Sequence, residues 1–205
     1  MFVGSARADI PAIELFIEAG PSASFTGTRG WEFGRLGGPN DIWITQLGVY
    51  DGGGDGLANS HEVGLWRRED NLSGTLLASA TVPAGTDSPL MGGYRWVPII
   101  PVRIPYALDF YMVGAHYVDG DADLLFTPIP VRFAPQVGPL LANGSYSLGP
   151  DMTYPNISTI PPSEGQLGER FFQANFQYVL VPEPATWLLL SPAALFFLVR
   201  RRIHA

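Results

Sequence analysis

The chain has 205 residues, a formal net charge of −7 and no cysteine. Without cysteine, a disulfide framework, a thiolate metal site and a cysteine nucleophile are excluded. All twelve basic residues are arginines; without the three near the C-terminal end, nine arginines face nineteen acidic residues, a formal charge of −10. This balance argues against binding to nucleic-acid phosphates, and it suits an exported protein whose carboxylates are available to calcium.

The first eight residues contain Ala6-Arg7-Ala8 ahead of Asp9, the pattern of a signal-peptide cleavage site. The basic and apolar regions that precede such a site in a complete signal peptide are absent. We therefore expect residues 1–8 to be the remnant of a signal peptide and the mature protein to begin near Asp9. The alternative is that Ala-Arg-Ala occurs by chance.

Residues 9–180 carry short runs in which apolar and polar residues alternate, mostly separated by turn residues. This period predicts strands, and the twenty-four glycines and nineteen prolines disfavour long helices. The expected fold of this domain is an all-β, antiparallel β-sandwich, jelly-roll-like, followed by a single C-terminal hydrophobic helix. The expected strands span residues 13–17, 41–50, 62–67, 75–82, 93–97, 108–118, 131–133 and 171–180.

Within residues 41–50, alternation predicts two faces: Ile42, Ile44 and Tyr50 on one, and Trp43, Thr45, Leu47 and Val49 on the other. Residues 62–67 and 75–82 are expected to pair antiparallel across a turn-rich loop. Residues 134–168 are rich in Pro, Gly, Ser and Asn and are expected to form a loop-rich insertion.

A glycine-rich acidic loop follows residue 50 and reads Asp51-Gly52-Gly53-Gly54-Asp55-Gly56-Leu57. Glycines let carbonyl and carboxylate oxygens converge as a hard cation requires, so Asp51 and Asp55 are candidate calcium ligands. The alternative is a hairpin turn in which Asp and Gly only supply turn geometry.

A second acidic loop, Asp119-Gly120-Asp121-Ala122-Asp123, has the alternate-aspartate spacing of half a calcium loop, without the later glutamate of an EF-hand. His61 is a candidate ligand or base, against the alternative of a structural hydrogen-bonding residue. No Gly-x-Ser-x-Gly or His-Glu-x-x-His motif occurs, and no catalytic residue is predicted.

The C-terminal residues differ from all the others: an uncharged, largely apolar stretch spans residues 185–199. As a helix it would extend about 22 Å, less than the roughly 30 Å core of a bilayer, so a buried core helix is one interpretation. Its apolar residues occupy all sides of such a helix, and arginines follow directly, which favours a membrane helix with a cytoplasmic stop signal. The flanking residues are Pro182, Glu183 and Pro184 on one side and Arg200, Arg201 and Arg202 on the other.

The Pro-Glu-Pro motif, the short apolar stretch and the arginine cluster, in this order, resemble the PEP-CTERM sorting signal of Gram-negative, exopolysaccharide-producing bacteria. The resemblance covers residues 181–205, with its specific features ending at Arg202. It implies recognition by an exosortase, a membrane transpeptidase that cuts near the motif and releases or transfers the body. The alternative is a permanent single-span anchor.

The body resembles a β-sandwich domain of unknown function that recurs in PEP-CTERM proteins. The resemblance lies in residues 47–57, in Ser60-His61-Glu62-Val63-Gly64-Leu65-Trp66, and in residues 74–82. It extends over about residues 31–118 and implies no activity.

These observations predict a non-enzymatic surface or extracellular-matrix protein linked to exopolysaccharide or biofilm. Its expected partners are an exosortase, membrane lipid through residues 185–199, and exopolysaccharide, but no nucleic acid. The body would lie on the outer side of the cell envelope, first membrane-bound and then at the surface or in the matrix. One alternative is a carbohydrate-binding module with calcium-ordered loops, and another is a secreted hydrolase with two facing carboxylates. The module would stack sugars on Trp31, Trp43, Trp66 or Trp96.

Overall fold

The computed structural model describes residues 9–15, 25–35, 41–106, 109–123, 132–139, 145–156 and 172–181. These residues contain no α-helix, and their strands pair antiparallel, which confirms the predicted all-β architecture. The strands are β1 (Ile10–Pro11), β2 (Ile13–Leu15), β3 (Gly27–Arg35), β4 (Ile42–Tyr50), β5 (His61–Arg68), β6 (Gly74–Val82), β7 (Leu90–Met91), β8 (Tyr94–Ile104), β9 (Phe110–Tyr117), β10 (Arg132–Phe133), β11 (Val137–Pro139), β12 (Ser145–Leu148) and β13 (Ala174–Leu180).

Several predictions concern residues outside the described ranges. These are the signal-peptide remnant at residues 1–8, the sorting motif at 182–184, the membrane helix at 185–199 and the arginine cluster at 200–202. Within the described ranges the single helical element is the short 3-10 turn η1 (Gly52–Gly54), and no helix there is long and apolar enough to cross a membrane.

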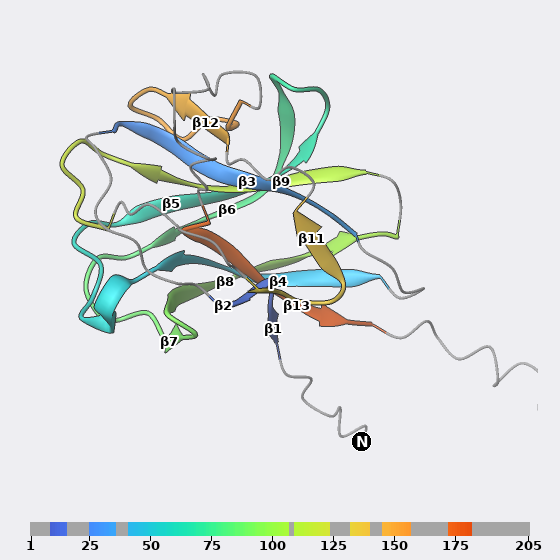
Figure 1. Cartoon of the computed structure of the whole chain (residues 1–205), viewed down its shortest axis with the longest axis horizontal. Coiled ribbons are helices and arrows are strands. Elements are labelled where there is room, and N and C mark those ends of the chain that lie inside the picture. The colour runs from blue at the N-terminus through green and yellow to red at the C-terminus, as the bar shows by residue number, and fades with distance from the viewer. Residues whose placement is uncertain are drawn as a thin grey trace, which may run out of the picture.

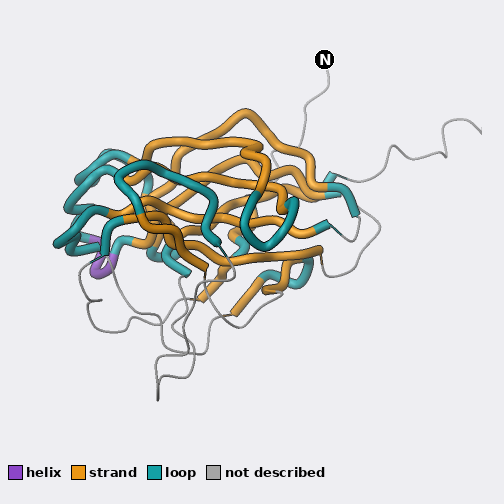
Figure 2. The backbone as a smooth tube through the Cα atoms, turned by 90° about the horizontal axis from the view of Figure 1, so that it is seen from above, coloured by secondary structure: helices purple, strands orange, loops and turns teal. Residues whose placement is uncertain are grey.

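The strands form two main sheets that lie one above the other (Figure 1). The first sheet has the order β1-β13-β4-β8-β7 and the second the order β11-β3-β9-β5-β6, with β12 also paired to β3. β10 and β2 form a separate two-stranded sheet. Seen from above, many of the described loops gather with η1 at one end of the strands (Figure 2). Both candidate ligand loops belong to this end, because they follow β4 and β9.

The hydrophobic core lies between the two sheets and is rich in aromatic side chains. Trp31 on β3 is fully buried and packs against rings from both layers, including Phe176 on β13 at a centroid distance of 6.0 Å. Its indole Nε1 donates a hydrogen bond of 2.7 Å to the carbonyl oxygen of Ala174, which also lies on β13. A buried indole N–H needs such an acceptor, and here the hydrogen bond joins the two sheets.

The predicted faces of β4 are wrong for part of the strand. Ile42 and Ile44 share the core with Leu47 and Val49, all with no exposed surface. The pairing with β8 and β13 shifts register around Thr45, so that Gln46 rather than Thr45 follows Ile44 in the ladder. An extra residue in a strand of period two moves all later side chains to the opposite face.

The strand β3 was absent from the sequence prediction, although it is an interior strand of the second sheet and is buried throughout. Its sequence, GTRGWEFGR, has glycines and charged residues in place of apolar alternation. β8 is also longer than predicted because it continues through Pro98 and Pro101. Within residues 134–168, β11 and β12 both pair with β3.

Candidate functional site

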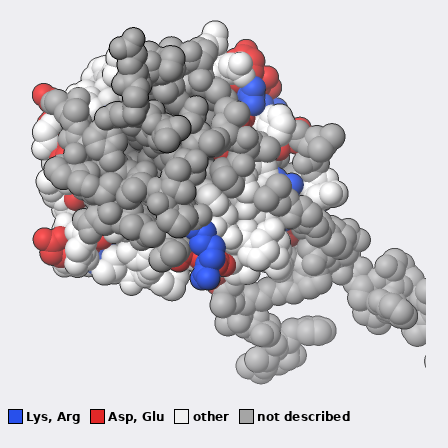
Figure 3. Space-filling model, in the orientation of Figure 1, with Lys and Arg blue, Asp and Glu red and all other residues white. Residues whose placement is uncertain are grey.

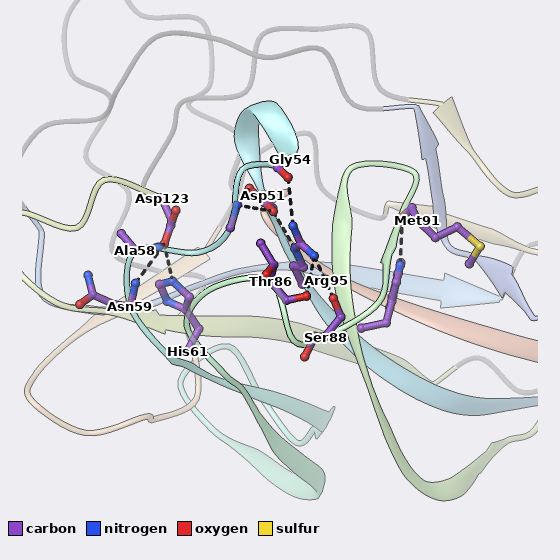
Figure 4. A network of polar contacts seen from close by, with 12 residues as sticks. Asp51, Gly54, Ala58, Asn59, His61, Thr86, Ser88, Met91, Arg95 and Asp123 are labelled. Carbon is purple, nitrogen blue, oxygen red and sulfur yellow. Dashed lines mark hydrogen bonds and ion pairs between the residues drawn. The ribbon is translucent and has the colours of Figure 1, made fainter.

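Three connections meet at one end of the sandwich. The chain leaves β4 at Tyr50 and enters β5 at His61; it leaves β6 at Val82 before β7; and it leaves β9 at Tyr117. Figure 4 shows polar side chains of these connections in two neighbouring networks. One network is centred on Arg95 and the other on His61.

In the first network, Arg95 of β8 holds the glycine-rich loop in place. Its Nε donates a hydrogen bond of 2.7 Å to Asp51 Oδ2, and its Nη2 donates one of 3.0 Å to the carbonyl oxygen of Gly54 (Figure 4). Nη1 donates to the carbonyl oxygens of Thr86 and Ser88, which belong to the neighbouring connection. Asp51 in turn accepts a hydrogen bond from the backbone N–H of Gly56. One guanidinium therefore joins two loops to the first sheet.

This network places the two predicted calcium ligands in different surroundings. Asp51 is 2% exposed and its carboxylate is bound by the Arg95 guanidinium, whereas Asp55 is exposed. A calcium ion at this loop would have to share Asp51 with Arg95, so calcium binding by Asp51 and Asp55 stays a prediction. Arg95 was not singled out in the sequence, where nothing marks an arginine forty-four residues after Asp51 as its partner.

In the second network, the topology brings His61 beside the acidic loop of residues 119–123. β5 pairs antiparallel with β9, so the start of β5 lies next to the end of β9, from which the acidic loop continues. The N–H of Asp121 donates to the carbonyl oxygen of Val118, and Gly120 takes a positive φ of 73° in this turn. The N–H of Asp123 then donates to Asp121 Oδ1 over 3.0 Å, which turns the chain so that Asp123 reaches His61.

The three side chains form a compact buried cluster, which we call the His-Asp-Asp cluster: His61, Asp121 and Asp123. His61 is 1% exposed, and each aspartate is 8% exposed. His61 Nε2 lies 3.1 Å from Asp123 Oδ2, and Nδ1 lies 3.7 Å from Asp121 Oδ2 and 3.0 Å from the carbonyl oxygen of His116. One possible ligand atom from each of the three residues lies within 4.8 Å of the other two.

Asp123 also fixes the glycine-rich connection at its far end. Its Oδ2 accepts hydrogen bonds from the backbone N–H groups of Ala58, over 2.7 Å, and of Asn59, over 3.4 Å (Figure 4). Between the two networks, Leu57 is buried and its backbone forms two hydrogen bonds with Gly85. The loop of residues 51–60 is therefore held at its start by Arg95 and at its end by Asp123.

The electrostatics of the cluster favour positive charge at His61. Burial by itself lowers the pKa of His61, but hydrogen bonds with Asp123 and His116 and the negative charges of both aspartates raise it, and the net direction is upward. Tyr117 packs against the imidazole at a centroid distance of 4.8 Å. Burial, followed by the charges of Asp121 and Asp123, raises the pKa of the Tyr117 hydroxyl well above its ordinary value.

The four tryptophans of the body offer little surface to a sugar. Trp31, Trp66 and Trp96 are at most 3% exposed, and Trp43 is partly buried. Trp66 lies on the outer face of its sheet, where it covers Gly64 and meets the ring of Tyr154 edge-on at 6.2 Å. Trp96 donates its Nε1–H to the carbonyl oxygen of Met91 over 3.0 Å.

No protein-family model, curated protein or solved structure matches this chain. The fold and the two polar networks therefore define only its class, an all-β protein of two packed antiparallel sheets with a polar loop cluster at one end.

Proposed function

We propose that this chain is an exported, non-enzymatic surface or extracellular-matrix protein, addressed by a PEP-CTERM signal and processed by an exosortase. The observation that carries the proposal is the order of three features: Pro182-Glu183-Pro184, the apolar stretch 185–199, and Arg200-Arg201-Arg202. An apolar stretch followed by arginines stops in a membrane with the arginines on the cytoplasmic side, which leaves the preceding domain outside.

A structural rather than catalytic body is supported by the state of its polar groups. The carboxylate of Asp51 is bound by Arg95, and the carboxylates of the His-Asp-Asp cluster lie below the surface. Catalytic acids and bases must reach their substrate, so these buried carboxylates are poorly placed to act as a hydrolytic pair.

The surface supports the same proposal. On the face shown in Figure 3, the described charged residues stand in small scattered groups, some of them acidic alone and some acidic and basic together. With a formal net charge of −7, the chain lacks the basic surplus that binds nucleic-acid phosphates. The buried tryptophans count against the sugar-stacking alternative. The matrix association proposed here therefore rests on delivery by the tail.

The test is to produce the chain in a bacterium that processes PEP-CTERM proteins and in the same strain without its exosortase. We expect the body outside the cell, or at its surface, in the first strain and an uncut membrane-bound form in the second. Glu183→Gln should cause retention of the uncut form. The control Glu62→Gln removes the same charge from an exposed position in the body and should be processed normally. Equal distribution of the chain in the two strains would contradict the proposal.

A further inference from the structure

We propose that His61, Asp121 and Asp123 bind one divalent transition-metal ion of the Zn²⁺ or Mn²⁺ class. This inference concerns the body alone and does not depend on the sorting signal.

The two nitrogens of the His61 imidazole face different partners. Nδ1 lies 3.0 Å from the carbonyl oxygen of His116, which can only accept a hydrogen bond, so Nδ1 carries a proton. Nε2 then faces Asp123 Oδ2 at 3.1 Å. If the imidazole is neutral, Nε2 and Asp123 Oδ2 are both acceptors. Either a second proton or a metal ion must then lie between them. A histidine that binds a metal through one nitrogen commonly donates its other N–H to a backbone carbonyl, as His61 does here.

The separation of these two atoms fits a shared ion. Zinc bonds to histidine nitrogen and carboxylate oxygen are about 2.0–2.2 Å long, so two ligands of one ion stand on the order of 3 Å apart. The 3.1 Å between Nε2 and Asp123 Oδ2 agrees with this spacing.

Asp121 independently supports a bound cation. Its Oδ1 accepts the hydrogen bond from the N–H of Asp123, but its Oδ2 is buried and has no hydrogen-bond partner among the described residues. The Asp121 side chain is 1% exposed, and its Oδ2 lies 3.7 Å from Nδ1 of His61. A buried carboxylate oxygen without a partner carries a large desolvation cost, and coordination to a cation removes that cost. Because the ion would be bound by Nε2, Asp121 Oδ2 would have to turn from Nδ1 toward Nε2 to complete the three-ligand set.

The charge of the cluster also favours a divalent cation. Two carboxylates with a neutral imidazole carry a charge of −2, and no arginine among the described residues forms an ion pair with either aspartate. A divalent cation neutralises this charge in full, whereas a proton on His61 neutralises half of it. Buried charge needs such compensation.

The donor set selects the class of ion. Calcium and magnesium take oxygen ligands, while one imidazole nitrogen with two carboxylate oxygens suits Zn²⁺ or Mn²⁺. Because Asp123 also binds the backbone at Ala58 and Asn59, the ion would fasten the acidic loop to the start of β5 and to the glycine-rich connection. Its role would be structural.

The experiment uses the full chain, freed of metal by a chelator and titrated separately with Zn²⁺, Mn²⁺ and Ca²⁺ by calorimetry and by thermal unfolding. We expect one equivalent of Zn²⁺ or Mn²⁺ to bind and to raise the Tm, and Ca²⁺ to bind more weakly at this site. On addition of Zn²⁺, the ¹⁵N resonance of His61 Nε2 should shift while Nδ1 keeps its proton.

Asp121→Asn is the decisive variant, because it removes the charge and the free oxygen while an amide oxygen can still accept from the N–H of Asp123. Loss of an outer-shell partner weakens metal sites by about 10–100-fold, so loss of a direct ligand should weaken Zn²⁺ binding at least tenfold. Asp119→Asn, at an exposed residue of the same loop, is the matched control and should bind like the parent.

His61→Gln should abolish the calorimetric signal, and if that variant does not fold, Asp121→Asn and the resonance shift decide the matter. Absence of saturable binding at one equivalent would overturn the proposal, leaving His61 as a protonated partner of Asp123. Binding that is equal in the parent and in Asp121→Asn would also overturn it.

Discussion

Arg95 Nε lies 2.7 Å from Asp51 Oδ2, and the two side chains are 6% and 1% exposed, so the sandwich contains a buried ion pair at the root of its glycine-rich loop. The same strand carries a second arginine, Arg103, whose Nε lies 2.6 Å from Asp41 Oδ2 with side chains 60% and 24% exposed. The two pairs have the same chemistry and differ in burial. They form a natural comparison of what burial does to an ion pair.

We expect Arg95→Met to lower the free energy of unfolding by about 3–5 kcal/mol, because it leaves Asp51 as an uncompensated buried charge. It also removes the donor to three carbonyl oxygens, those of Gly54, Thr86 and Ser88. Arg103→Met, at the exposed pair, should cost about 0–1 kcal/mol. Urea denaturation of both variants checks the difference, and equal losses would show that Arg95 does not hold the loops together.

Asp51→Asn should lower the free energy of unfolding less than Arg95→Met does. The amide oxygen can still accept from Gly56 or Arg95, and the guanidinium keeps its three carbonyl partners. The same denaturation series gives the order of stability: parent, then Asp51→Asn, then Arg95→Met. The reverse order would place the carboxylate, not the guanidinium, at the centre of the network.

Gly30 of β3 pairs with Gly114 of β9, and the two backbones approach too closely for a side chain. A Cβ at Gly30 would lie 2.3 Å from the carbonyl oxygen of Val113, a backbone atom that cannot rotate away. We expect Gly30→Ala to lower the free energy of unfolding by about 1–3 kcal/mol or more, as overpacking of an ordered interior does. Gly92→Ala is the control: its φ is +62°, but no atom of the described residues lies within 4 Å of the added Cβ, so only backbone strain of about 1–2 kcal/mol applies. A smaller loss in Gly30→Ala than in Gly92→Ala would contradict the close approach of β3 and β9.

Tyr178 of β13 gives a prediction for alkaline pH. Its side chain is fully buried, its hydroxyl donates to Gln136 Oε1 over 2.8 Å, and burial raises its pKa to about 12. A tyrosine in the unfolded chain loses its proton near pH 10. Between about pH 10 and 12 the unfolded chain therefore binds fewer protons than the folded one, and stability must fall as the pH rises.

We expect Tyr178→Phe to reduce the slope of this loss, which unfolding curves recorded at several pH values will measure. Tyr106→Phe, at a residue 58% exposed, serves as the control and should leave the slope as in the parent. An unchanged slope in Tyr178→Phe would contradict the raised pKa.

The sequence predicts those strands in which apolar residues alternate. β5 and β6 pair as expected, with His61 opposite Val82 and Arg68 opposite Gly74, and β9 and β13 lie where their alternating residues place them. β3 was missed because its three glycines and its charged residues give no strand pattern. Its burial arises from partners distant in sequence, β9, β11 and β12. The register shift at Thr45 was also invisible, because a bulge is defined by the neighbouring strands.

The polar networks also depend on contacts between residues that are distant in the sequence. Both acidic loops and His61 stand out in the sequence as separate motifs, but their spacing in the chain does not show that the second loop, and not the first, reaches His61. That follows from the pairing of β5 with β9. Asp51 lies in a glycine-rich acidic motif and is a candidate calcium ligand from the sequence, whereas its partner Arg95 has no local motif around it.

The proposed removal of the tail is best tested by the intact mass of the mature protein from a bacterium with an exosortase. We expect a C-terminus near Pro182-Glu183-Pro184, without residues 185–205. A mature protein that still ends after Arg202 would contradict processing and would make the tail a permanent anchor.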